Sequence, residues 1–174
     1  MQRITLATGI FMAILIFPGT VPAEMTFIWV GAPAEASIRV GAASGETTVV
    51  HNVPVANIGD GTPITGSPQY VVIEVSARRA SFWDAWGTNF VVTADSSTPL
   101  SNGFEPIYFS EIHWTSEDGD IPDGRFDDSS AQVILPSTSV FWQVSDRLTF
   151  IYDNSRVVSA GTYTGTVTYT ISIP

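Results

Sequence analysis

The stretch that decides the fold is the C-terminal sequence YTGTVTYTISI, which runs from Tyr163 to Ile173. Its apolar and aromatic side chains fall on one face, at Tyr163, Val167, Tyr169, Ile171 and Ile173, and threonine or serine fills the other face. Because successive side chains of a strand point to opposite faces, this period of two predicts a half-buried β-strand and fits no helix. The β-branched and aromatic composition favours the same assignment.

A second strand is predicted immediately upstream, over Arg147–Tyr152, and the turn sequence Asp153-Asn154-Ser155 follows it. Turn formers between two apolar runs indicate a reversal of the chain. We therefore expect residues 163–173 to be a central strand that pairs with residues 147–152.

The rest of the chain continues as short apolar runs that are separated by turn-forming residues. Strands are predicted at residues 26–30, 36–40, 47–55, 70–76, 89–94, 107–115, 131–135 and 140–144. Loops are predicted at residues 57–69, 96–105 and 117–128, which are rich in Gly, Pro, Asn, Asp and Ser. About ten short strands without a helical period predict one all-β domain, an antiparallel immunoglobulin-like β-sandwich.

The N-terminus has the pattern of a secretory signal peptide. Arg3 precedes an apolar run from Ile4 to Phe17, Pro18-Gly19 ends the run, and Val21-Pro22-Ala23 offers a small residue for cleavage. This pattern predicts a signal peptide over residues 1–23, a mature domain over residues 24–174, and a secreted, extracellular or cell-surface location. An uncleaved N-terminal anchor is the alternative. No other run is long enough to cross a bilayer, so we expect no membrane span in the mature chain.

The composition narrows the classes of partner. There is no Cys and no Lys, and all seven basic residues are Arg. Without Arg3 the mature chain carries six Arg against seventeen acidic residues, a net charge of −11. Nucleic acid and anionic membranes are therefore poor partners. Without disulfides, the domain must be held by its core and its sheets.

An acidic loop between residues 117 and 128 is a candidate calcium site. Its aspartates are Asp118, Asp120, Asp123, Asp127 and Asp128, and Glu117 precedes them. Carboxylate oxygens at this density are ligands that Ca²⁺ prefers. The spacing differs from that of an EF-hand loop and the closing Glu is absent, so a solvated hairpin loop is the alternative. No other cofactor is predicted.

Aromatic and histidine residues offer two further candidate functions. Trp83 and Trp86 lie in an irregular segment, where they form either a platform for stacking a glycan or the packed rim of the core. The histidines, His51 and His113, lie in apolar strand contexts and belong to no catalytic motif. We therefore predict that the protein is not an enzyme.

The sequence from Ala160 to Ile171, AGTYTGTVTYTI, resembles the closing strand of secreted bacterial fimbrial and coat subunits. Those families include the cysteine-free alternate-chaperone fimbrial subunits and the spore coat protein U-like domains. The resemblance implies an immunoglobulin-like sandwich that polymerises by donating a strand to its neighbour. The donor would be the mature N-terminus, between Glu24 and Val40, with Phe27, Ile28, Trp29 and Val30 as the candidate donor strand.

Together these features predict a secreted, non-enzymatic structural or adhesive surface subunit that acts through contacts with itself or with other surface subunits. The alternative is an extracellular carbohydrate- or calcium-binding β-sandwich module. The two predictions differ in what they must expose: an assembling subunit needs an open strand edge, and a glycan binder needs a solvent-facing Trp83 or Trp86.

Overall fold

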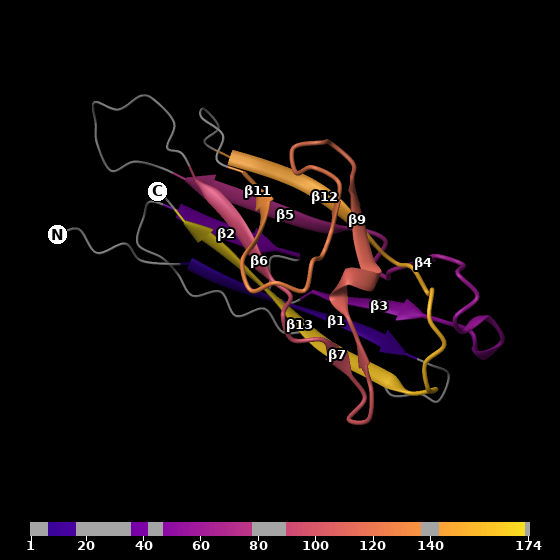
Figure 1. The fold of residues 1–174 in the computed structure, drawn as a ribbon. Coiled ribbons are helices and arrows are strands. Elements are labelled where there is room, and N and C mark those ends of the chain that lie inside the picture. The colour runs from indigo at the N-terminus through magenta and orange to yellow at the C-terminus, as the bar shows by residue number, and fades with distance from the viewer. Residues whose placement is uncertain (1–6, 17–35, 42–46, 78–89, 137–142, 173–174) are drawn as a thin grey trace, which may run out of the picture.

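Two β-sheets pack face to face in the computed structural model, which describes residues 7–16, 36–41, 47–77, 90–136 and 143–172 (Figure 1). Sheet A contains β1 (Ala7–Ile16), β3 (Thr48–Asn52), β6 (Val91–Asp95), β7 (Leu100–Ser101), β8 (Pro106–Ile107), β11 (Gln132–Leu135) and β13 (Thr162–Ser172). Sheet B contains β2 (Ala36–Val40), β4 (Ile64–Thr65), β5 (Val71–Ala77), β9 (Ile112–Ser116), β10 (Gly124–Arg125) and β12 (Gln143–Tyr152). The predicted all-β sandwich is confirmed.

Each sheet is organised around one long strand. Sheet A has the order β11-β6-β13-β1-β3, with β7 on β13 and β8 on β7, and sheet B has the order β10-β9-β12-β5-β2, with β4 on β12. All pairs are antiparallel except β1 and β3, which are parallel. Two 3₁₀ turns complete the described elements, η1 (Val55–Asn57) and η2 (Phe109–Glu111).

The core lies between the sheets because the strands bury alternate side chains, as β13 shows. Its buried residues are Tyr163, Val167, Tyr169 and Ile171, and the intervening threonines are partly exposed or exposed. The ring of Phe126, which follows β10, stacks on the ring of Phe150 of β12, with centroids 6.0 Å apart. The predicted faces of the closing strand, and its central place in its sheet, are confirmed.

The predicted pairing of residues 147–152 with residues 163–173 is wrong. β12 pairs with β4, β5 and β9 in sheet B, whereas β13 pairs with β1, β6 and β7 in sheet A. The connection between them is nine residues long, and buried Asn154 adopts a positive φ of 50° within it. A connection of this length carries the chain across the sandwich, whereas a tight hairpin would keep both strands in one sheet.

Other predicted boundaries change locally. The strand expected at 107–115 is interrupted by η2, where the Glu111 N–H donates to the Tyr108 carbonyl and Phe109 turns into the core. The strands expected at 140–144 and 147–152 are parts of a single strand, β12. The predicted strand at 26–30 lies outside the described residues. Within the described part of the chain, no helix is long and apolar enough to cross a membrane.

Candidate functional site

The strand β1 lies between β13 and β3, and its position defines the candidate site. It pairs with β13 over ten positions, from Ala7 opposite Ile171 to Ile16 opposite Thr162. It also pairs with β3 over five positions, which end with Ile16 opposite Asn52. Among the described strands, β1 alone joins β3 to the rest of sheet A. We call the place of β1 between β13 and β3 the strand slot.

The sequence assigns this same segment to a signal peptide and predicts no strand there. A continuous apolar run shows no period of two, so periodicity does not assign it to a strand, and pattern alone missed β1. If cleavage occurs after Ala23 as expected, all of β1 leaves with residues 1–23. β13 would then keep its pairs with β6 and β7 and lose its partner on the other edge.

The edges of the slot are formed by strands that also supply core side chains. On β13, Tyr163, Val167 and Tyr169 are buried against the opposite sheet, and on β3, Val49 and His51 are buried. An empty slot would leave backbone N–H and C=O groups unpaired on two facing edges, next to this apolar interior. Unpaired edges of this kind are templates for strand addition.

His51 is fixed at the β3 edge by close packing. Its Nδ1 lies 2.9 Å from the Ile64 carbonyl oxygen, and its ring lies edge-on to Tyr152 with centroids 6.3 Å apart. Gly66 permits the close packing of β3, because a Cβ there would lie 2.2 Å from the Val49 side chain and 3.2 Å from His51 Cε1. Burial lowers the pKa of His51 to about 4, so the ring is neutral at physiological pH. The prediction that His51 has a structural role agrees with these contacts.

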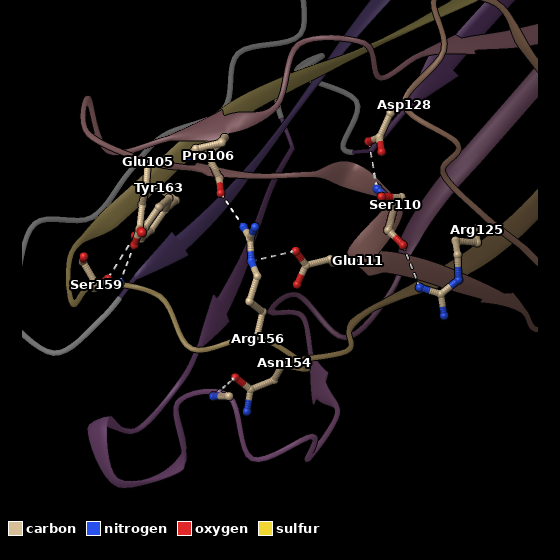
Figure 2. Close-up of polar contacts among 11 residues, drawn as sticks. Glu105, Pro106, Ser110, Glu111, Arg125, Asp128, Asn154, Arg156, Ser159 and Tyr163 are labelled. Carbon is tan, nitrogen blue, oxygen red and sulfur yellow. Dashed lines mark hydrogen bonds and ion pairs between the residues drawn. The ribbon is translucent and has the colours of Figure 1, made fainter.

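The loop that follows β12 is held by a tyrosine at the start of β13, as Figure 2 shows. The Tyr163 hydroxyl donates to a Glu105 carboxylate oxygen and lies 3.0 Å from the carbonyl oxygen of Ser159, four residues upstream. The Ser159 N–H donates to the same Glu105 oxygen. A tyrosine that bonds back to the chain upstream is a known corner device of immunoglobulin-like sandwiches. It fixes the entry of β13 into the slot region.

The acidic loop is organised around a carboxylate that the sequence analysis did not name. Asp146 on β12 is 1% exposed and accepts from the Ser116 hydroxyl at 2.6 Å, the Ile121 N–H at 2.7 Å and the Asp118 N–H at 3.2 Å. Burial raises the pKa of Asp146, but these hydrogen bonds outweigh burial and leave the pKa below its ordinary value. The role of Asp146 follows only from the position of its side chain next to the loop, so no pattern in the local sequence could have predicted it.

The five predicted calcium ligands are dispersed around this anchor. Asp123 accepts from the Ser116 N–H at 2.7 Å, Asp127 from the Ser129 N–H at 3.0 Å, and Asp128 from the Ser110 N–H at 2.9 Å. Asp118 and Asp120 are exposed. No group of three metal-ligating side chains occurs among the residues that the structure describes. Calcium binding by this loop stays a prediction.

The other predicted site residues fall outside the described ranges. These are the candidate platform, Trp83 and Trp86, and the candidate donor strand, Phe27, Ile28, Trp29 and Val30. The C-terminal part of the expected donor segment is described: Ala36–Val40 forms β2, which pairs with β5 in its own sheet. Any donated strand must therefore lie upstream of Ala36.

Two remaining polar groupings are satisfied internally. His113 Nδ1 lies 2.9 Å from Asp153 Oδ1, and Arg125 pairs with the other oxygen of Asp153. A cleft of about 420 Å³ on the outer face of sheet B contains Tyr70. The guanidinium of Arg147 lies over the Tyr70 ring and is 3.1 Å from the Glu117 carboxylate.

The described chain thus offers the strand slot as its clearest candidate site. Comparison with protein families, curated proteins and solved structures found no match.

Proposed function

We propose that the protein is a secreted, non-enzymatic surface subunit whose copies assemble by strand donation, as in the fimbrial-type subunits that its closing strand resembles. The observation that carries the proposal is the position of β1. The ten residues that complete sheet A belong to the segment expected to be removed on export. A mature chain would then need another strand in the slot.

The occupant that we propose is the segment 24–35 of a second copy, which includes Phe27, Ile28, Trp29 and Val30. This segment has twelve residues, and β1 pairs with β13 over ten positions. It is therefore long enough to replace β1 along the whole slot. Its apolar residues suit a strand that is covered on one face by a core.

The direction of β1 favours a slot filled by segment 24–35 of another copy over a slot filled by the same segment of its own chain. β1 ends beside Thr162 at one end of the sandwich. Ala36 lies at the other end, where it pairs with Ala77 of β5, next to the first residue of β12, Gln143 (Figure 1). Ten strand residues span about 33 Å. The two spare residues of segment 24–35 span about 7 Å. A segment bound in the direction of β1 therefore cannot return to its own Ala36.

Electron microscopy and size-exclusion chromatography of the mature chain, residues 24–174, test the proposal. We expect filaments or a series of oligomers, and a matched variant that lacks residues 24–33 should be monomeric. A labelled peptide of residues 24–35 should bind that variant, and a scrambled peptide of the same composition should not. A mature chain that is monomeric at high concentration and indifferent to the deletion would contradict strand donation.

The same chain allows the alternative of a calcium- or carbohydrate-binding module to be tested separately. Calorimetric titration of the mature protein with calcium, and binding to a panel of glycans before and after Trp83→Ala and Trp86→Ala, report on that function directly. These measurements do not depend on whether the slot is filled.

A further inference from the structure

One end of the sandwich gathers three loops, and we call it the loop end. It consists of residues 53–63 after β3, residues 102–105 between β7 and β8, and residues 153–161 before β13. The slot opens at this end, because Ile16 of β1 lies opposite both Thr162 and Asn52. Figure 1 shows the end of β1 and the start of β13 together on this side, away from the start of β2.

Side chains of the loop before β13 tie the loop end together (Figure 2). Buried Asn154 donates to the Asn57 carbonyl at 2.7 Å and accepts from the Gly59 N–H at 2.9 Å. Arg156 donates to the Pro106 carbonyl at 2.5 Å, and its Nε lies 3.5 Å from Glu111. Glu105 of the loop 102–105 accepts from the Ser159 N–H, and together these bonds fix the three loops relative to one another. A surface ordered in advance loses less conformational entropy when a partner binds.

The same loops expose apolar side chains. The exposed fraction is 95% for Phe104, 76% for Val157 and 58% for Val55. Val157 packs so closely on Gly59 that a Cβ there would lie 2.7 Å from its Cγ2, which links two of the loops directly. Apolar side chains that gather on one exposed surface mark a candidate protein contact, and these three come from the three loops of the loop end.

We propose that the loop end is the surface on which the body of the next subunit packs, with Val55, Phe104 and Val157 as its apolar contacts. This inference rests on the proposed strand donation. A donor segment 24–35 bound like β1 leaves the slot at the loop end, and only two residues then separate it from Ala36 of its own chain. That spacer of about 7 Å holds the start of β2 in the donating chain against the loop end of the chain that accepts the segment. The contact joins different surfaces of identical chains and so continues head to tail.

The absence of Cys from the sequence permits a direct crosslinking test on the mature chain. Asn52→Cys marks the loop end and Ala36→Cys marks the opposite end, so the two sites are far apart within one chain but adjacent across the proposed contact. A short bismaleimide should give a ladder of covalent oligomers from the double variant. Each single variant should give none beyond a dimer. Replacing Asn52→Cys by Val133→Cys, on the edge strand β11, should greatly reduce the ladder.

Substitution of the apolar residues tests their part in the contact. Phe104→Ser combined with Val157→Ser should raise the protein concentration needed for assembly by about tenfold or more, because both side chains would otherwise be buried. The matched control is Val133→Ser, which is 54% exposed on β11 and should leave assembly unchanged. Binding of peptide 24–35 to the chain lacking residues 24–33 should be the same in all these variants.

The outcomes separate the two proposals. Peptide binding without a crosslinked ladder, or assembly indifferent to Phe104→Ser and Val157→Ser, would overturn the loop-end contact and leave strand donation standing. Failure of the peptide to bind, together with a monomeric mature chain, would overturn both.

Discussion

The two sheets of the sandwich differ in how much of the chain they require. Sheet B is built from residues between Ala36 and Tyr152, and its central strand β12 is paired on both sides by β9 and β5. Sheet A needs Ala7–Ile16 to connect β3 with β13. Loss of residues 1–23 would therefore leave sheet B whole and divide sheet A. The contrast is that sheet B is complete without residues 1–23, whereas sheet A depends on Ala7–Ile16 for the link between β3 and β13.

The largest effect is expected in the self-contained sheet. Asp146→Ala removes a buried acceptor from the Ser116 hydroxyl and from backbone N–H groups that include that of Ile121. Leaving these donors unpaired should lower the free energy of unfolding by about 3–5 kcal/mol. Urea denaturation of the monomeric chain that lacks residues 24–33 measures this.

A matched control variant and the peptide of residues 24–35 sharpen that result. Asp120→Ala, at an exposed position of the same loop, should change stability by less than about 0.5 kcal/mol. The loss caused by Asp146→Ala should be equal with and without the peptide of residues 24–35. A loss that disappears when the slot is filled would contradict the independence of sheet B.

The next effect is a pH dependence located at the slot edge. The pKa of His51 is about 4 when folded and near 6.5 when unfolded, so the unfolded chain binds the proton first as pH falls. The contribution is constant above pH 6.5, and between pH 6.5 and 4 it should lower the free energy of unfolding by about 3 kcal/mol.

Denaturation curves of the full chain at several pH values, beside those of His51→Gln, isolate this contribution. The variant keeps the carboxylates that also titrate in acid, so the difference in slope between the two proteins belongs to His51. Equal slopes would show that the ring is not held neutral at the β3 edge.

A smaller effect is expected where β13 begins. Tyr163→Phe removes the hydroxyl that donates to Glu105 and lies 3.0 Å from the Ser159 carbonyl oxygen. The free energy of unfolding should fall by about 1–2 kcal/mol. Because the ring and its packing remain, peptide uptake by the slot should persist. A loss of peptide binding would show that the Tyr163 hydroxyl is part of the binding site itself.

The smallest effect is expected at the outer edge of sheet B. Arg39 on β2 and Glu74 on β5 form an ion pair at 2.5 Å, and their side chains are 42% and 31% exposed. Solvent screens such pairs, so Arg39→Ala should change stability by less than about 0.5 kcal/mol, and added salt should reduce even that difference. A clearly larger loss would show that the β2 edge depends on this pair.

The sequence by itself determined which residues of the closing strand face the core. The period of two in residues 163–173 predicted the buried Tyr163, Val167, Tyr169 and Ile171. The stretches rich in Gly, Pro and Asp predicted loops, and each of these loops also contains one short strand, β4, β7 or β10. These properties are local, because the pleat of a strand alternates side chains whatever its partner is. For the same reason, alternation predicted a sandwich but could not say which strand lies beside which.

Only the tertiary structure decided the pairing and the candidate site. It placed β12 and β13 in different sheets, made Asp146 the acceptor of the acidic loop, and set residues 7–16 between β13 and β3. Each result joins residues far apart in the sequence, such as Ile16 with Thr162. Such contacts depend on the closure of long loops and on hydrogen bonds between distant backbones, and neither leaves a periodic trace in the amino-acid sequence.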